Sequence, residues 1–395
     1  MPVLRRALTF GIPSEEFATQ WRNPSDVFSI LLILGGDVVA RALAQLAGSG
    51  VTPVAFSFGW VAYAVMAVVS AVGENKLMPL PDCACKVING RTGYVRDNCS
   101  WVIGRIVRDY ESWMDDGNSN GQIHACVRRV IEEKWAALRV NGATVERPTQ
   151  AGLCVSVYNA VQTQPGRLRA DAYLLGLTTI VVQLVVAATP CFLFGDWAIL
   201  LVTVAGTVLA LLSGSLSQWA KEKWACRRNC SKTVVLTRGN GSQHAVVIVG
   251  CGRGFDLEDL AIGPLNVNVS TSYATRITIA GLAICWILLL ITAAGIQENT
   301  WFLVAVGGIG IVQNVFVAGW RRRPEDFGIF LEFKTVIGDP KVMDCLLRVE
   351  EELPYVGHSM RETFFPGVLR GDEKAKWDVL EADVANRAKA VAGRV

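Results

Sequence analysis

The sequence predicts an α-helical integral membrane protein with six transmembrane helices, arranged as three hairpins, and a cytosolic α+β part. Three observations support this fold class. The 395 residues are 51% apolar and only 18% charged, whereas soluble domains carry about 25% charged residues. The apolar residues gather in long runs. Lysine and arginine lie almost entirely in the terminal segments and the long segments between pairs of runs, and they are absent from the short connections within each pair.

Six apolar segments are long enough to consider as membrane spans. They run over residues 27–47, 51–72, 173–194, 197–219, 277–296 and 301–320. A helix needs roughly 20 apolar residues to cross about 30 Å of hydrocarbon, so we expect each segment to be one spanning helix. The first segment also contains Asp37 and Arg41. Spanning is the prediction for it, and a helix lying in the membrane interface is the alternative.

The connections within the three pairs are short. Residues 48–50, 195–196 and 297–300 contain no lysine or arginine, while the long segments are rich in both and Arg321–Arg323 follow the last run. Basic residues favour the cytosolic side, so we expect both termini and both long loops to be cytosolic. The predicted division is an N-terminal tail 1–26, hairpins 27–73, 173–219 and 277–320, a loop domain 74–172, a β-hairpin segment 220–276 and a C-terminal segment 321–395.

The long segments carry patterns that are typical of folded structure. Helical spacing of apolar residues predicts amphipathic helices over residues 99–114 and 121–140. Two β-branched runs around Gly239-Asn240-Gly241 predict a β-hairpin between residues 233 and 250. Residues 339–353 and 372–392 are expected to form closing helices.

Polar residues inside the apolar segments are the first candidate site. Asp37 and Arg41 are four residues apart, a spacing that places them on one helical face and allows an ion pair. Further candidates are Gln183, Gln313 and Asn314, and Gln45 is another polar residue of this kind. Polar groups at membrane depth mark substrate paths, but they also link helices to one another. Both interpretations stay open from the sequence.

A glycine-rich loop follows a strand-like run at residues 245–249. Gly250, Gly252 and Gly254 resemble the cofactor loop of Rossmann-like methyltransferases. That fold also needs a following helix, a second strand and an acidic residue about 20 positions further on, and the next apolar segment leaves no room for them. We therefore expect a turn at this place and no cofactor.

Cysteine pairs are a weak metal signal. Cys83 with Cys85 and Cys226 with Cys230 could supply four sulfur ligands, but neither pair has the usual two-residue gap of zinc sites. No metal site is therefore predicted. The net charge of +3 is too balanced to indicate a nucleic-acid partner. The expected partners are the lipid bilayer and other membrane or cytosolic proteins.

Several short runs resemble multi-pass membrane proteins of filamentous fungi. These are Arg22-Asn23-Pro24-Ser25-Asp26, Gly73-Glu74-Asn75-Lys76-Leu77-Met78-Pro79 and Gly195-Asp196-Trp197. The resemblance implies a eukaryotic host and a role beside secondary-metabolite enzymes, and it assigns no activity to any residue.

The functional hypothesis is a non-enzymatic membrane component that transports a solute or recruits partners through its cytosolic part. The alternative is a membrane-embedded enzyme or accessory protein that acts on a lipophilic substrate. No catalytic residue is assigned, and whether the chain is an enzyme stays open.

Overall fold

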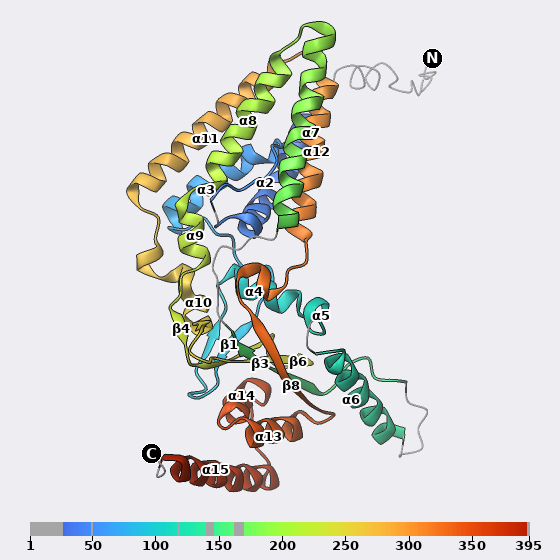
Figure 1. Ribbon diagram of the computed structural model, residues 1–395, viewed down its shortest axis with the longest axis vertical. Helices are drawn as coiled ribbons and strands as arrows, with labels where there is room; N and C mark the ends of the chain where they lie inside the picture. Colours follow the sequence, from blue (N-terminus) through green and yellow to red (C-terminus); the bar gives the residue numbers. More distant parts are fainter. Residues whose placement is uncertain (1–26, 49, 117–118, 140–145, 162–169, 393–395) are drawn as a thin grey trace, which may run out of the picture. The chain divides into compact units, whose positions relative to one another are not determined.

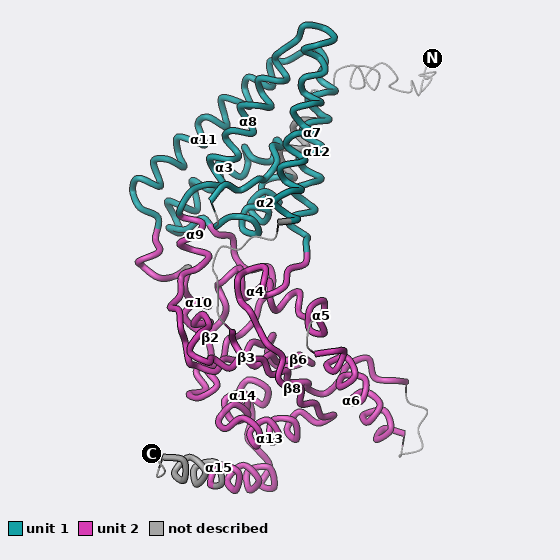
Figure 2. Tube along the Cα trace, viewed as in Figure 1, with its two compact units in different colours: residues 1–77, 170–217, 271–320 teal, residues 78–169, 218–270, 321–395 magenta. Residues whose placement is uncertain are grey.

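The computed structural model describes the chain except for residues 1–26, 49, 117–118, 140–145, 162–169 and 393–395. The chain divides into two compact units, shown in different colours in Figure 2. Residues 1–77, 170–217 and 271–320 form one, called here the helical unit. Residues 78–169, 218–270 and 321–395 form the other, called the sheet unit. The chain therefore passes repeatedly between the two units.

The helical unit contains long apolar helices (Figure 1). Their bounds are α2 Val27–Leu46, α3 Gly59–Gly73, α7 Ala170–Phe194, α8 Ala198–Gly214, α11 Tyr273–Ala294 and α12 Thr300–Gly319. Helix α2 packs against α3 and α12, and α11 packs against α3 and α8. Helix α7 packs against α8 and α12. The chain neighbours α2 and α3, and α7 and α8, thus pack against each other, as their short connections favour. The third predicted pair differs, because α11 packs against α3 and α8 while α12 packs against α2 and α7.

Three helices among the described residues are long and apolar enough to cross a membrane. They are α7, α11 and α12, and α8 together with the following α9 (Ser217–Lys223) makes a fourth if this bent pair counts as one span. The prediction of six spans is therefore not supported. Many large apolar side chains of these three helices face outward: Val185 is 64% exposed and Ile291 63%.

The first predicted hairpin differs most from the expectation. The uncharged run 51–72 is not one helix, because residues 51–57 have no regular secondary structure and only the 15-residue helix α3 follows. Pro53 explains part of this result, since proline lacks a backbone N–H and disfavours helix in the residue before it. Residues 52–58 are all buried, so an irregular segment lies inside the helical unit. We call residues 51–58 the inserted segment.

The sheet unit is built on a six-stranded sheet in the described part of the chain, with strand order β2-β1-β5-β6-β3-β8. The strands are β1 Lys86–Asn89, β2 Val95–Asp97, β3 Leu153–Ala160, β5 Thr233–Thr237, β6 His244–Val249 and β8 Leu331–Asp339. Strands β3 and β6 are parallel, and the other neighbouring pairs are antiparallel. Strand β3 lies between β6 and β8, so each of the three chain segments of the unit contributes to one sheet.

Helices cover both faces of this sheet (Figure 1). On one face, α4 Trp101–Arg108, α5 Tyr110–Trp113 and α10 Leu257–Ile262 contribute to a core with Val87, Tyr158 and Ile248. On the other, α13 Val342–Glu352, α14 Val356–Phe364 and α15 Gly371–Ala392 contribute to a core with Val155 and Val247. Because successive side chains of a strand point to opposite faces, the buried strands supply both cores.

The remaining elements of the sheet unit are short or peripheral. Helix α6 Gln122–Arg139 packs against β3 and β8. Strands β4 Arg228–Cys230 and β7 Gly254–Phe255 form a separate antiparallel pair. Single 3₁₀ turns occupy Gly263–Leu265, Val267–Val269 and Pro324–Phe327.

Several sequence predictions for the sheet unit are confirmed. The predicted hairpin is the antiparallel pair β5–β6, and the turn glycines Gly239 and Gly241 have positive φ. The helix expected over 121–140 is α6, and the closing helices are α13 and α15. The helix expected over 99–114 is broken at Asp109 into α4 and α5. Asp109 accepts a hydrogen bond from the backbone N–H of Arg322 at 2.9 Å, a distant contact that the local pattern does not contain.

Candidate functional site

The inserted segment is held by amide side chains from two spans. Gln183 of α7 is fully buried, and its Nε2 donates to the carbonyl oxygens of Phe56 at 2.7 Å and Val306 at 2.8 Å. One side chain therefore joins the inserted segment to α12. Backbone carbonyls outside a helix must find such partners wherever water is excluded.

Helix α12 supplies the other two amides. Oε1 of Gln313 accepts from the Ala55 N–H at 3.2 Å. Nδ2 of Asn314 donates to the Ala55 carbonyl at 3.3 Å and to the Ser57 hydroxyl at 3.2 Å. Gln313 and Asn314 are 5% and 1% exposed. Gln313 and Asn314 thus form hydrogen bonds with both the N–H and the C=O of Ala55.

Glycines on the spans make room for this segment. A Cβ on Gly310 of α12 would overlap the Phe56 carbonyl oxygen, and one on Gly176 of α7 would overlap the Pro53 carbonyl. A Cβ on Gly214 of α8 would stand 2.8 Å from Cβ of Thr52. The Thr52 hydroxyl donates to the Gly214 carbonyl at 2.8 Å. Small residues let backbones approach closely within membranes, and here three helices use them for the same segment.

The structure brings together Gln183, Gln313 and Asn314 but not the charged pair. Asp37 and Arg41 form the predicted ion pair on α2, with Arg41 Nε at 2.9 Å from Asp37 Oδ2. Their side chains are 63% and 45% exposed, and no contact with the three amides is found among the described residues. The inserted segment itself is the part that sequence reasoning missed. Pro53 within an apolar run was the available signal.

The amide cluster has hydrogen-bonding capacity to spare. Oε1 of Gln183, Nε2 of Gln313 and Oδ1 of Asn314 are buried and have no hydrogen-bond partner among the described residues. Buried polar atoms are usually paired. The cluster contains no carboxylate, so its free oxygens are neutral amide acceptors beside the backbone carbonyls of the inserted segment.

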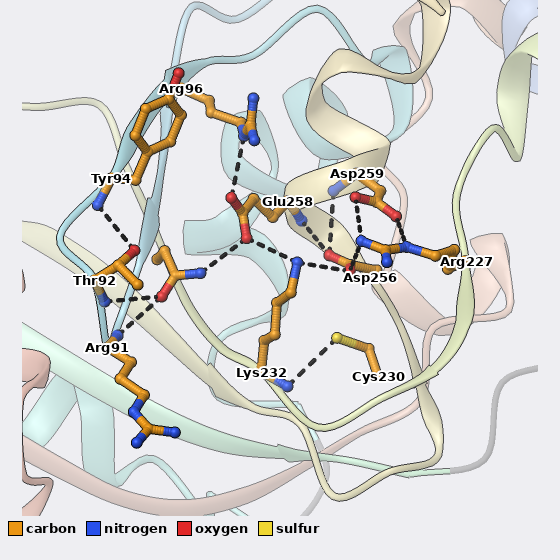
Figure 3. A network of polar contacts seen from close by, with 11 residues as sticks. Arg91, Thr92, Tyr94, Arg96, Arg227, Cys230, Lys232, Asp256, Glu258 and Asp259 are labelled. Carbon is orange, nitrogen blue, oxygen red and sulfur yellow. Dashed lines mark hydrogen bonds and ion pairs between the residues drawn. The ribbon is translucent and has the colours of Figure 1, made fainter.

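A second polar cluster lies in the sheet unit (Figure 3). The carboxylate of Glu258 accepts from Asn89 at 2.8 Å, Lys232 at 3.0 Å and Arg96 at 3.2 Å. Burial acts to raise the pKa of Glu258, but the bonds from Lys232, Asn89 and Arg96 together lower it. Lys232 also lies 2.9 Å from Asp256. The acids and bases of this network thus neutralise one another.

This network fastens α10 to the sheet. Asp256 caps α10 by accepting from the backbone N–H groups of Glu258 and Asp259, both at 3.1 Å. Arg227 bonds Asp259, and this contact lowers the pKa of the carboxylate. An open hollow of about 610 Å³ is lined by Tyr94, Arg96, Glu258 and neighbouring residues. Since each cation already faces a carboxylate, we interpret this network as structural.

The glycine-rich loop is used by the chain itself. The N–H groups of Gly250 and Gly252 donate to the carbonyls of Lys232 and Cys230 at 3.0 and 3.1 Å. A Cβ on Gly250 would stand 2.7 Å from the Cys230 carbonyl oxygen. Gly254 lies in β7 and pairs with Cys230. The glycines therefore allow two backbone stretches to meet, and the N–H groups of Gly250 and Gly252 are already used within the chain.

The cysteine pairs do not form a metal site in the described residues. No group of three or more His, Cys, Asp or Glu side chains there is placed to hold a metal ion. Cys85 is buried, and burial is the main cause that raises its pKa to about 12. Burial likewise raises the pKa of Cys226 to about 12.

A cleft beside His244 was not predicted. It has a volume of about 340 Å³ and is lined by Tyr110, Glu111, Arg238, Gln243, His244 and their neighbours. Burial lowers the pKa of His244, and its Nδ1 has no hydrogen-bond partner among the described residues. The Tyr110 hydroxyl and the Ser156 hydroxyl are 2.6 Å apart. A lone histidine within a strand gave no sequence signal for this cleft.

Comparison with family models, curated proteins and solved structures found no match for this chain. The resemblance to fungal membrane proteins and the link to secondary metabolism therefore stay predictions. The geometry of the residues alone carries the functional argument.

Proposed function

We propose that this chain is a multi-pass membrane protein whose helical unit transports a small monovalent cation, with the inserted segment as its selective element. Membrane insertion is supported by α7, α11 and α12, which have the length and composition of spans and present large apolar side chains outward. Arg321–Arg323 directly after α12 support a cytosolic sheet unit.

One observation carries the transport proposal: a buried, non-helical backbone segment lies among the candidate spans and is held by Gln183, Gln313 and Asn314. Non-helical backbone at membrane depth is tolerated only inside protein or along a wet path. Transporters use such unwound segments, because their carbonyl oxygens can coordinate ions.

The chemistry of the cluster favours a monovalent cation. The oxygens of the cluster that have no hydrogen-bond partner among the described residues are those of the Gln183 and Asn314 amides, which are neutral oxygen ligands. Divalent cations are held in proteins with the help of carboxylates. Rings of neutral oxygens instead select monovalent ions.

The test is cation flux through the full chain reconstituted in sealed liposomes. With Rb⁺ and Na⁺ as probes, we expect uptake above that of empty vesicles. Gln183→Leu should lower the uptake at least tenfold, because it removes both the donor to Phe56 and the free oxygen. Thr292→Val is the matched control. The hydroxyl of Thr292 bonds only the carbonyl of Leu288 in its own helix α11, so uptake should be unchanged.

Folding of each variant is checked by the thermal transition of the protein in detergent. Uptake by the folded wild-type protein that equals that of empty vesicles contradicts transport. That result would leave the partner-recruiting form of the hypothesis, which predicts no flux. Equal uptake by wild type and a folded Gln183→Leu variant would remove the inserted segment from the mechanism.

The His244 cleft favours a second candidate, an enzyme or ligand-binding role in the sheet unit. A half-buried histidine with a lowered pKa beside a cleft of about 340 Å³ is a group that can accept a proton. The charged lining of Glu111 and Arg238 suits a small polar substrate rather than a lipophilic one. A polar metabolite that raises the unfolding temperature of the wild type but not of His244→Asn would support this role. If a library of polar metabolites contains no compound with this effect, a ligand-binding role of the His244 cleft is contradicted.

A further inference from the structure

Three cysteines from separate elements meet beside β8. Cys126 of α6 is 7% exposed, and Cys154 of β3 and Cys345 of α13 are fully buried. A Cβ on Gly338 of β8 would stand 2.6 Å from Sγ of Cys126 and 3.0 Å from Sγ of Cys154. Gly338 is also the register partner of Cys154 in the sheet. The missing side chain of Gly338 thus leaves the two sulfur atoms as direct neighbours.

One of the two thiols has a cation beside it. An Nη atom of Arg129 lies 3.7 Å from Sγ of Cys126 and donates to the Gly338 carbonyl at 3.2 Å. Its other Nη lies 3.0 Å from Glu133 on the surface of α6. The side chain of Arg129 is 51% exposed, so the Cys126 side of the cluster reaches the protein surface.

The surroundings make the two thiols unequal. The hydrogen bond from Cys154 and the charge of Arg129 lower the pKa of Cys126, although burial and Glu133 oppose them. The hydrogen bond to Cys126 and burial raise the pKa of Cys154. A low-pKa thiolate that is next to a protonated thiol is the usual arrangement of a reactive and a resolving cysteine.

We propose that Cys126 is a peroxide-reactive cysteine and that Cys154 resolves it as an intramolecular disulfide. The Cys126 thiolate attacks one oxygen of hydrogen peroxide, the O–O bond breaks, and with one proton the products are Cys126 sulfenic acid and water. The Cys154 thiol then attacks the Cys126 sulfur. An S–S bond forms, the S–OH bond breaks, and the second water leaves. The sulfurs lose two electrons in total, and the peroxide gains them.

The disulfide would tie α6 to strand β3, which lies next to the edge strand β8. Helix α6 packs against β3 and β8 along the buried residues Ile123, Cys126 and Val130. Its other side is largely exposed. A covalent link at Cys126 fixes one end of this helix to the sheet, and a reductant releases it. The inference does not depend on the transport proposal, since every residue involved belongs to the sheet unit.

The experiment uses the purified full chain in detergent at pH 7 with equimolar hydrogen peroxide. After N-ethylmaleimide blocks the remaining thiols, peptide mapping without reductant should find Cys126 linked to Cys154, and dithiothreitol should reverse the link. In Cys154→Ser, dimedone should trap the sulfenic acid on Cys126. In Cys126→Ser, neither product should form.

Three controls keep the test specific. Cys345→Ser should still form the link, because this third thiol takes no part. Arg129→Gln should slow the reaction about tenfold at pH 7, because losing the cation raises the pKa of Cys126 and lowers its thiolate fraction. Cys85, buried with a pKa raised to about 12, should stay reduced. A Cys126 thiol that remains free after peroxide treatment, or a link to Cys345 in place of Cys154, overturns the proposal.

Discussion

At the residue scale, buried polar groups of this protein occur in sets that serve one another. Glu258 is the clearest case, because its carboxylate accepts from Lys232, Asn89 and Arg96 while only 8% of its side chain is exposed. Burial of an ionised carboxylate is costly unless several donors compensate for it. The three donors come from β1, β2 and the start of β5, so one side chain links α10 to three places on the sheet.

We expect Glu258 to make stability depend on acid pH. Folding lowers the pKa of Glu258 below its ordinary value of 4.5. The ionised carboxylate therefore contributes fully to folding stability above the pKa of the unfolded chain, and this contribution is lost as the pH falls through the lower pKa of the folded protein. Glu258→Gln should reduce stability at neutral pH by about 1–3 kcal/mol. It should also flatten the loss of stability below about pH 4.5.

Denaturant unfolding of the full chain in detergent, followed by tryptophan fluorescence between pH 3 and 7, measures both effects. The exposed Glu351 on α13 supplies the matched control, since Glu351→Gln removes a carboxylate without buried contacts. If the two variants show the same pH profile, the network of Figure 3 does not stabilise the ionised form of Glu258.

At the element scale, the inserted segment shows how one stretch of chain relies on its neighbours. Backbone outside helices and sheets leaves N–H and C=O groups that need other partners. Ala55 and Phe56 find them in the amides of α7 and α12, and the Ala55 carbonyl also accepts from Nε1 of Trp60 at 2.9 Å. Close approach then requires glycine at the contact points on those helices. The segment, its amides and its glycines therefore form one unit of structure.

Two glycines on α12 should respond oppositely to alanine. Gly310→Ala places a Cβ on the Phe56 carbonyl and 2.8 Å from Nε2 of Gln183, and we expect a loss of about 1–3 kcal/mol. Gly308→Ala meets nothing within 4 Å and should be neutral or stabilising by up to about 1 kcal/mol. Thermal unfolding in detergent compares them, and equal transition temperatures would mean that the inserted segment does not pack against α12 as described.

At the scale of the whole molecule, the sheet joins chain segments that are interrupted by the spans. Strand β3 comes from residues 78–169, β6 from 218–270 and β8 from 321–395, and β3 pairs with both of the others. We therefore expect all three segments to lie on the same side of the bilayer, since they share one hydrogen-bonded sheet. Residues 170–217 and 271–320 would then each cross the bilayer an even number of times.

We expect a membrane-impermeant maleimide to react equally with cysteines in all three segments of the sheet unit. The exposed native Cys251 reports on the middle segment, and Arg91→Cys and Glu351→Cys at exposed positions report on the other two. In sealed cells none should react, and after permeabilisation all three should react, as located by peptide mapping. Reaction of one site alone in sealed cells would be incompatible with the sheet.

The sequence by itself determined the elements that depend on local composition. The spans α7, α11 and α12 follow from hydropathy, and the β5–β6 hairpin follows from Gly239-Asn240-Gly241. Helix α6 follows from its apolar periodicity. It also identified Gln183, Gln313 and Asn314 as buried polar candidates, because an amide within an apolar run has no water to bind.

Only the tertiary structure decided the rest. An uncharged run such as 51–72 has the same composition whether it is helical throughout or irregular in its first part. The irregular conformation of residues 51–57 depends on amides and glycines of α7, α8 and α12, which are far away in the sequence. The same holds for Asp37 and Arg41, which lie apart from the amides, and for Cys126 and Cys154, which meet at Gly338. Contacts between residues far apart in the sequence produce no periodic pattern along the chain, because the conformation of each partner depends on the position of the other in the folded protein.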